Sequence, residues 1–235
     1  MIYQPLGIKL TDEEGMMTIA DYAYNYIKDR IISQEFPPAS PVDTKQLMER
    51  LGVGKTPLRE ALQRLSFERL IVISPRRGTF VSDISIIQLQ QAFDARLLVE
   101  RYTARVAATT MTEEQIAALR DLFKDTDEIA SRSDYMESIS VDQRFHYLIA
   151  EASHNEYLRD FLSMLLPVTM RFWHYVHSLA KNSGAKIREA HRRHFPVIEA
   201  LASGDPNTAE RAMANHIITF RDEAMELIMS GGKLG

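Results

Sequence analysis

Hydrophobic and polar residues follow helical spacing in the first part of the chain. In residues 18–34 apolar side chains recur every three or four positions, which predicts an amphipathic helix. After a proline-rich break, Asp43 and Gly52 are residue types that begin and end helices, so a short helix is expected between them. The next helix is expected to start at 54–56, with Pro57 in its first turn, where a missing N–H costs nothing. Its inward stripe is Leu58, Ala61, Leu62 and Leu65. Two short helices joined by a glycine turn indicate a helix-turn-helix.

The segment LIVISPRRGTFV, residues 70–81, has a different pattern. It contains two β-prone runs around a Pro-Arg-Arg-Gly turn, which predicts a hairpin or wing. Residues 17–81 are therefore expected to form a winged helix-turn-helix domain, preceded by an N-terminal extension at 1–16. The alternative is an ordinary helical hairpin with a solvated charged face, but that alternative does not require the turn, the wing and a basic bias together.

Beyond about residue 83 the strand patterns end and only helical spacing remains. Amphipathic helices are expected at about 85–110, from 113 onward, and at about 134–152, 157–180, 185–203 and 206–229. Gly204, Asp205 and Pro206 supply a helix stop, an N-cap and a first-turn proline in succession. The fold class is thus mainly α, with an all-helical bundle of about six helices over residues 83–230.

The distribution of charge suggests an anion-binding module at the front of the chain. Residues 17–81 carry ten Lys/Arg and seven Asp/Glu, whereas residues 82–235 carry seventeen and twenty-two. Lys55, Thr56 and Arg59 lie off the inward stripe of the second short helix, and a helix that enters the major groove presents such side chains to base edges. The Gly-Lys-Thr at 54–56 is not a phosphate loop, because Glu49 occupies the position of the required glycine and helix precedes it.

The absence of cysteine excludes disulfides, thiolate zinc sites and cysteine nucleophiles. No apolar run approaches the ~18 residues of a membrane helix, and the N-terminus lacks a basic-then-apolar signal pattern. We therefore expect a soluble, cytoplasmic protein with no membrane partner.

Three histidines are expected to point into the helical core. Asp142 and His146 are spaced i, i+4 and project from one side of a helix, while His194 and His216 each lie within an inward-facing stripe. Imidazoles with one carboxylate suit zinc, nickel or manganese. A set of satisfied core histidines remains the alternative. His191 is the best spare ligand. His154 is expected at a turn, and His174 and His177, spaced i, i+3, could bind metal but are expected to line the bundle or its surface.

The head resembles a known family of regulators. The segments KTPLREALQRL and RRGTFV resemble the recognition helix and wing of the GntR family of bacterial transcription regulators. Position by position, the resemblance implies DNA contacts by Lys45, Lys55, Thr56, Arg59, Arg76, Arg77 and Gly78. Three residues depart from the family pattern: Gly54 replaces a serine cap, Lys55 replaces an arginine, and Arg69 stands where glycine is usual. These departures affect the operator sequence more than the act of DNA binding.

The body is similar to the FCD domain of the FadR subfamily, on the segments DQRFH, HFPVIEALASGD and AMANH. This resemblance implies that Asp142, His146, His194 and His216 are the ligands of a divalent metal, zinc before nickel or manganese. Pro196 departs from a regular helix and is expected to kink it beside His194.

These observations together predict a transcription regulator and not an enzyme. We expect a homodimer that binds a palindromic double-stranded DNA operator, most simply as a repressor. A small organic acid would bind at the metal site and weaken DNA binding, with Arg96 and Arg171 as clamps for its carboxylate, although either arginine is also consistent with an ordinary ion pair. The alternatives are a metal-dependent hydrolase-like enzyme and a regulator that responds to an acyl thioester.

Overall fold

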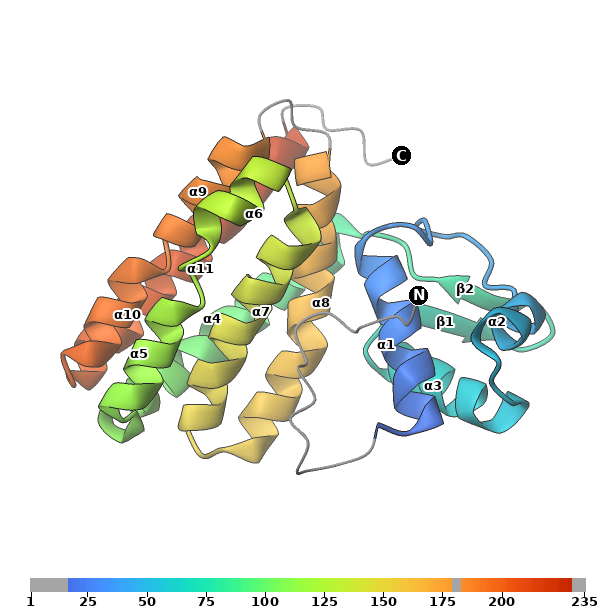
Figure 1. Ribbon diagram of the computed structural model, residues 1–235, viewed down its shortest axis with the longest axis horizontal. Coiled ribbons are helices and arrows are strands. Elements are labelled where there is room, and N and C mark those ends of the chain that lie inside the picture. Colours follow the sequence, from blue (N-terminus) through green and yellow to red (C-terminus); the bar gives the residue numbers. More distant parts are fainter. Residues whose placement is uncertain (1–16, 179–182, 230–235) are drawn as a thin grey trace. The chain divides into compact units, whose positions relative to one another are not determined.

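The chain divides between residues 85 and 86 into two units, which are described separately. The structure, a computed structural model, describes residues 17–178 and 183–229. In Figure 1 the first unit runs from blue to teal and the second from green to red. No helix in the described part of the chain is both long and apolar enough to cross a membrane.

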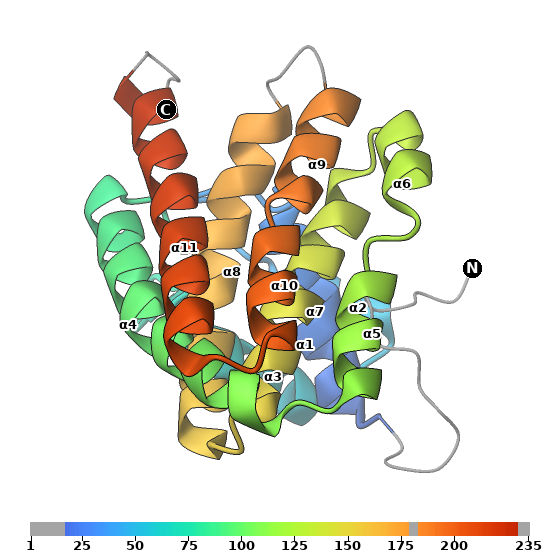
Figure 2. The ribbon, with the colours of Figure 1, turned by 90° about the vertical axis from the view of Figure 1, so that its left-hand side faces the viewer.

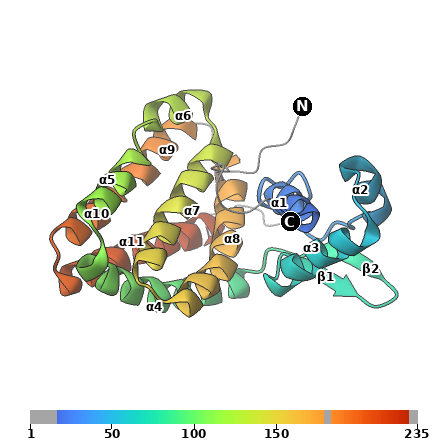
Figure 3. The same cartoon turned by 60° about the horizontal axis from the view of Figure 1, so that its bottom comes forward.

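The first unit is a winged helix-turn-helix. Its elements are α1 (Ile19–Ile32), α2 (Thr44–Leu51), α3 (Lys55–Phe67), β1 (Ile71–Ser74) and β2 (Gly78–Val81). The core lies mainly between α1 and α3, and it includes the predicted stripe of α3, of which all four residues are buried. The two strands pair antiparallel, with Ile71 opposite Val81 and Ser74 opposite Gly78, and form the wing (Figure 3).

Local chemistry sets the boundaries of the two short helices. The Asp43 side chain accepts hydrogen bonds from the backbone N–H groups of Lys45 and Gln46, both at 3.0 Å, and so caps α2. Gly52 ends α2 in the left-handed conformation, with φ at +64°. Gly54 begins α3 without a side-chain cap, as its replacement of the family serine implies. The predicted turn chemistry is therefore confirmed.

The second unit is entirely helical. Its described helices are α4 (Ile86–Thr110), α5 (Glu113–Asp121), α6 (Thr126–Arg132), α7 (Tyr135–Ala152), α8 (Glu156–Ser178), α9 (Ser183–Arg192), α10 (Phe195–Ala202) and α11 (Pro206–Met229). Helix α7 packs against α4, α8, α6 and α9, while α4 also packs against α8 and α11 (Figure 2). The unit thus surrounds α7 with helices that come from distant parts of the sequence.

The all-helical character of the second unit is confirmed. Within the described residues between 86 and 229 the unit has eight helices, whereas about six were expected. The expected helix at 185–203 is divided into α9 and α10, because Pro196 occupies the first turn of α10 and cannot donate a hydrogen bond back to α9. The other additional helix is α6, which is too short for its spacing to be recognised. His194 therefore lies at the break between two helices and not in the middle of one.

Candidate functional site

The predicted DNA contacts all lie on the surface of the first unit. They are exposed on α2, on the first turn and a half of α3, and in the wing turn: Lys45, Lys55, Thr56, Arg59, Arg76, Arg77 and Gly78. Arg76 and Gly78 have positive φ angles of 65° and 107°, so the wing tip turns sharply and presents its arginines to solvent. Among the described residues, none of these five cations forms an ion pair.

Other cations of the same unit are committed to the fold. Lys28 donates to Glu68 at 2.9 Å, and Arg64 pairs with Asp21 at 2.5 Å and lies over the ring of Tyr24. These pairs tie α1 to α3. The five cations among the predicted DNA contacts thus take no part in these ion pairs and are available for phosphate groups, which such side chains contact when they position a protein on DNA.

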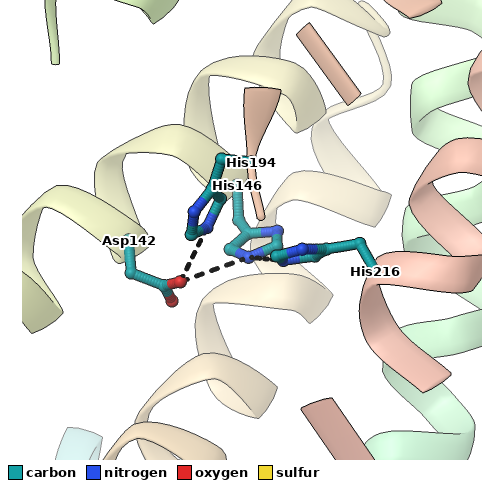
Figure 4. A group of neighbouring side chains, drawn as sticks. All are labelled: Asp142, His146, His194 and His216. Carbon is teal, nitrogen blue, oxygen red and sulfur yellow. Dashed lines mark hydrogen bonds and ion pairs between the residues drawn. The ribbon is translucent and has the colours of Figure 1, made fainter. Parts of the chain in front are cut away.

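The four predicted metal ligands meet in the core of the second unit (Figure 4). Asp142 and His146 come from α7, His194 from the junction of α9 and α10, and His216 from α11. One candidate ligand atom from each residue lies within 4.8 Å of the others. The three histidines are buried, and the side chain of Asp142 is 15% exposed.

The distances between these atoms suit a small cation. The Nε2 atoms of His146 and His216 are 3.4 Å apart, and the Nε2 of His194 is 2.9 Å from Oδ1 of Asp142. An ion with metal–nitrogen distances of 2.0–2.1 Å in tetrahedral geometry separates its ligands by about 3.3 Å. The donor atoms therefore lie near the spacing that a first-row divalent metal needs.

The contacts of His194 also point to a cation. Its Nδ1 faces the carbonyl oxygens of Ala190 at 3.1 Å and His191 at 3.3 Å, while its Nε2 faces the Asp142 carboxylate. A neutral imidazole has one N–H and can donate to only one of these sides. Either a second proton or a metal ion at Nε2 satisfies both, so the residues present fit a bound metal.

Aromatic rings enclose the cluster. Phe123 stacks on His194 with ring centroids 4.8 Å apart, and Phe145 meets the same ring edge-on at 4.6 Å. Both phenylalanines are buried. This apolar wall excludes water from the cluster and strengthens the interactions within it.

Burial and neighbouring charge control protonation of the cluster. Burial lowers the pKa of His216 well below its usual value, and His194 and His146 lower it further. Burial would raise the pKa of Asp142, but His146 and His194 outweigh burial and bring it below the usual range. His216 is thus neutral and Asp142 ionised near neutral pH, the states that metal ligation requires.

The structure also reveals a buried network that sequence reasoning missed. Glu100 and Arg96, one turn apart on α4, form an ion pair at 2.5 Å, and both are 1% exposed. Arg96 also donates to the hydroxyl of Thr169 at 2.8 Å and lies 3.3 Å from Nε2 of His146. The second oxygen of Glu100 contacts Nδ1 of His146. In the sequence, the i, i+4 spacing of Arg96 and Glu100 was the signal for their ion pair. Helical periodicity does not show that this pair faces α7.

Arg171, the other predicted effector clamp, is buried on α8. The contacts described above among the four ligands, Arg96 and Glu100 do not include it. Its proposed role therefore has less geometric support than that of Arg96.

The remaining histidines separate clearly from the cluster. Both ring nitrogens of His191 have partners, Thr126 at 2.8 Å and Ser138 at 2.9 Å, so the predicted spare ligand is a satisfied core residue. Burial, with His194, lowers the pKa of His191 to about 4. His174 is half-buried on α8, where burial lowers its pKa, and His154 lies in a turn with φ at +53°. The side chain of His177 lies outside the described residues.

One cavity lies beside the cluster, and a second, larger cavity borders the first. The smaller, of about 40 Å³, is lined by Asp142, His191, Ser138 and Met170 among others. The larger, of about 320 Å³, lies between α8, α9 and α11. Trp173, Lys186 and Phe220 line both cavities, so the larger one borders the smaller one next to Asp142.

The match to known families covers nearly the whole described chain. Residues 19–81 match the bacterial regulatory proteins of the gntR family, and residues 91–219 match the FCD domain. The chain is 26% identical over 204 residues to the HTH-type transcriptional repressor RspR of Escherichia coli, covering 87% of this chain and 88% of that protein. It is also 26% identical over 197 residues to the Nta operon transcriptional regulator of Aminobacter aminovorans, covering 84% and 90% of the two chains.

Solved structures share the fold. McbR/YncC of E. coli superposes with a TM-score of 0.78 at 23% identity, covering 92% of this chain and 99% of that one. A putative GntR regulator from Rhodococcus superposes with a TM-score of 0.70 at 20% identity, covering 90% and 98%. The winged head, the helical body and both sequence matches lead to one assignment. The chain belongs to the GntR family of bacterial regulatory proteins, carries an FCD domain, and is a DNA-binding transcription regulator.

Proposed function

We propose that this regulator is a repressor whose operator binding is controlled by a small carboxylate effector at a divalent metal site. The observation that carries the proposal is the convergence of Asp142, His146, His194 and His216 in the core of the second unit. Three imidazoles and one carboxylate suit zinc, with nickel or manganese as alternatives. When bound, such an ion supplies positive charge and one or two open coordination positions that attract an anion.

The cavity next to Asp142 supports an effector of small size. Its volume of about 40 Å³ admits a carboxylate group or a few waters, and the larger cavity of about 320 Å³ accommodates the rest of a ligand. Arg96 uses three of its five N–H groups on Glu100, Thr169 and His146, which leaves two for a carboxylate. Lys186 lines both cavities and forms no ion pair within the described residues, so it is a further candidate beside Arg96 and Arg171.

The DNA contacts are proposed for the exposed residues of the head. Base edges or phosphates would be contacted by the cations of α3 and the wing, which are Lys55, Arg59, Arg76 and Arg77. Lys45, Thr56 and Gly78 would contribute further contacts. A single head buries little surface on DNA, and a homodimer on a palindromic operator doubles the number of contacts.

Exposed apolar side chains on two helices of the second unit support the homodimer. Leu98 and Tyr102 on α4 are 71% and 52% exposed, and Tyr157 and Phe161 on α8 are 79% and 44% exposed. Helices α4 and α8 pack on each other, and large apolar side chains left in water favour association. Light scattering at micromolar concentration should give a dimer that Leu98→Arg weakens, and a monomeric wild type, free and on DNA, would contradict the proposal.

The central experiment combines metal analysis with operator binding. The purified protein should carry about one divalent metal per chain, and a thermal-shift screen of short carboxylic acids and sugar acids should find compounds that stabilise the metal-loaded form only. These compounds should weaken operator binding in an anisotropy titration, whereas chelator-treated protein should bind the operator without responding to them. A protein that cannot be loaded with zinc, nickel or manganese, or an effector response unchanged after chelation, would refute the metal-site part.

A further inference from the structure

Glu100 is a fully buried carboxylate that contacts two partners, although one cation is enough to neutralise its charge. Its side chain is 1% exposed, and a buried carboxylate costs several kcal/mol unless it is paired. The guanidinium of Arg96 already provides that pairing, through Nε at 2.5 Å from Oε1. The other oxygen, Oε2, is nevertheless directed at Nδ1 of His146. The second contact therefore calls for an explanation other than neutralisation of Glu100.

That contact determines where the proton of His146 resides. A carboxylate oxygen and a ring nitrogen in such close contact repel each other unless a proton lies between them. Nδ1 of His146 therefore carries a proton, and since the guanidinium of Arg96 can only donate, Nε2 of His146, 3.3 Å from Nη2 of Arg96, holds the lone pair. This lone pair lies 3.4 Å from Nε2 of His216 and 3.8 Å from Oδ1 of Asp142, at the centre of the ligand cluster.

The three histidines of the cluster differ in this support. Nδ1 of His194 faces the neutral carbonyl oxygens of Ala190 and His191. Nδ1 of His216 has no hydrogen-bond partner among the described residues, and Nδ1 of His146 has none in hydrogen-bond geometry either, but Nδ1 of His146 is in direct contact with the Glu100 carboxylate. Among the described contacts of the three Nδ1 atoms, only that of His146 is with a carboxylate, and a charged acceptor there raises the basicity of the opposite nitrogen and its strength as a ligand.

Glu100 also balances the charge beside the cluster. Nη2 of Arg96 lies 3.3 Å from Nε2 of His146, where an uncompensated guanidinium would repel a cation. The ion pair with Glu100 offsets that charge. Loss of the carboxylate would thus remove the orientation of His146 and expose the site to Arg96 at the same time.

We propose that Glu100 is a positioning residue of the metal centre, holding the Nδ1 proton of His146 so that the Nε2 lone pair faces the ion. This inference rests on the metal site of the proposed function. It assigns to α4 a part in metal binding although α4 supplies no ligand.

The test uses the full-length protein, stripped with chelator and titrated with Co²⁺, whose visible absorption reports coordination. Glu100→Gln keeps the shape of the side chain but removes its charge, and it should raise the Co²⁺ dissociation constant about 10- to 100-fold. Thr169→Val is the matched control, because it removes a hydrogen bond to Arg96 in the same core and leaves the contact of Glu100 with His146 intact. Its Co²⁺ affinity should stay close to that of the wild type.

A second measurement does not require the Glu100→Gln variant to fold. Nitrogen-15 NMR of labelled histidines in the metal-free wild type should show His146 protonated at Nδ1, assigned by loss of the signal in His146→Gln. A folded Glu100→Gln protein with wild-type affinity, or a wild-type His146 protonated at Nε2 alone, would overturn the proposal. If the wild type binds no Co²⁺, the metal site itself fails, and the NMR result still decides whether Glu100 holds the proton of His146.

Discussion

Removal of a single ligand histidine should abolish most of the stabilisation that a metal gives to this protein. His216 is the informative position, because it is the only proposed ligand of the cluster that α11 contributes. Its substitution by alanine leaves Asp142, His146 and His194 in place, so the effect isolates one ligand. His174→Ala is the matched control, since His174 is a half-buried histidine on α8 that lies outside the cluster.

The magnitude follows from mass action. At free Zn²⁺ one hundred times its dissociation constant, binding stabilises the folded state by about 2.7 kcal/mol. For a domain of this size each kcal/mol raises Tm by roughly 2–4 °C, so saturation should raise Tm by roughly 5–11 °C. If loss of one ligand weakens binding about 100-fold, the remaining stabilisation is about 0.4 kcal/mol, or about 1 °C.

Differential scanning fluorimetry with chelator and with a zinc buffer measures this shift directly. The quantity to compare is the metal-induced change in Tm, because the effect of the substitution on the metal-free protein cancels in that difference. His174→Ala should retain the wild-type shift. Equal shifts in His216→Ala and the wild type would show that the metal binds elsewhere.

Three further predictions concern the head, its backbone and pH. Arg59 is exposed and unpaired among the described residues, so Arg59→Ala should cost about 1–3 kcal/mol in operator binding measured by anisotropy, and unchanged affinity would remove it from the interface. Arg69 has φ at +59°, which disfavours side chains other than glycine, so Arg69→Gly should raise the free energy of unfolding by about 1 kcal/mol in urea denaturation, and a destabilised variant would contradict this view of the turn. His191 has its pKa lowered to about 4, so its contribution to stability is complete above its ordinary pKa of 6.5 and is lost as pH falls from there toward 4. Denaturation across that range should show a loss of up to about 3 kcal/mol, which His191→Gln should reduce, and an identical pH profile would exclude His191 as the source.

The sequence could predict the features that local chemistry determines. Asp43 and Gly52 identify the ends of α2, and the apolar stripe of α3 identifies its buried face, because caps and amphipathic spacing depend on neighbouring residues. The convergence of the ligand side chains was also accessible, since inward-facing histidines on separate helices of one bundle share its core. Their role as metal ligands stays a prediction.

The contacts between helices could not be predicted in the same way. Helical spacing shows which side of α4 is apolar, but the partner of Glu100 depends on how α4 and α7 are rotated against each other. For the same reason the sequence left open whether Arg96 is an effector clamp or an ion-paired residue, and it did not identify Glu100 as the partner. Pro196 predicted a kink in the helix expected at 185–203. Only the packing of α9 against α6 and of α10 against α11 shows that this helix separates into two.

Helix α4 connects the proposed metal site to the head along the chain. Four residues separate it from β2 of the wing, and it contains Arg96 and Glu100, which contact His146. It also packs along α11, which carries His216. An effector that moves Arg96 or the ligands must therefore act on the helix that leads directly from the wing.

Because coupling between two binding sites is reciprocal, the factor by which an effector weakens operator binding must equal the factor by which saturating operator weakens effector binding. Calorimetric titration of the metal-loaded protein with effector, in the presence and absence of operator, measures the second factor. Unequal factors would mean that the two ligands do not act on a shared equilibrium, and α4 would then be a structural connection without a part in regulation.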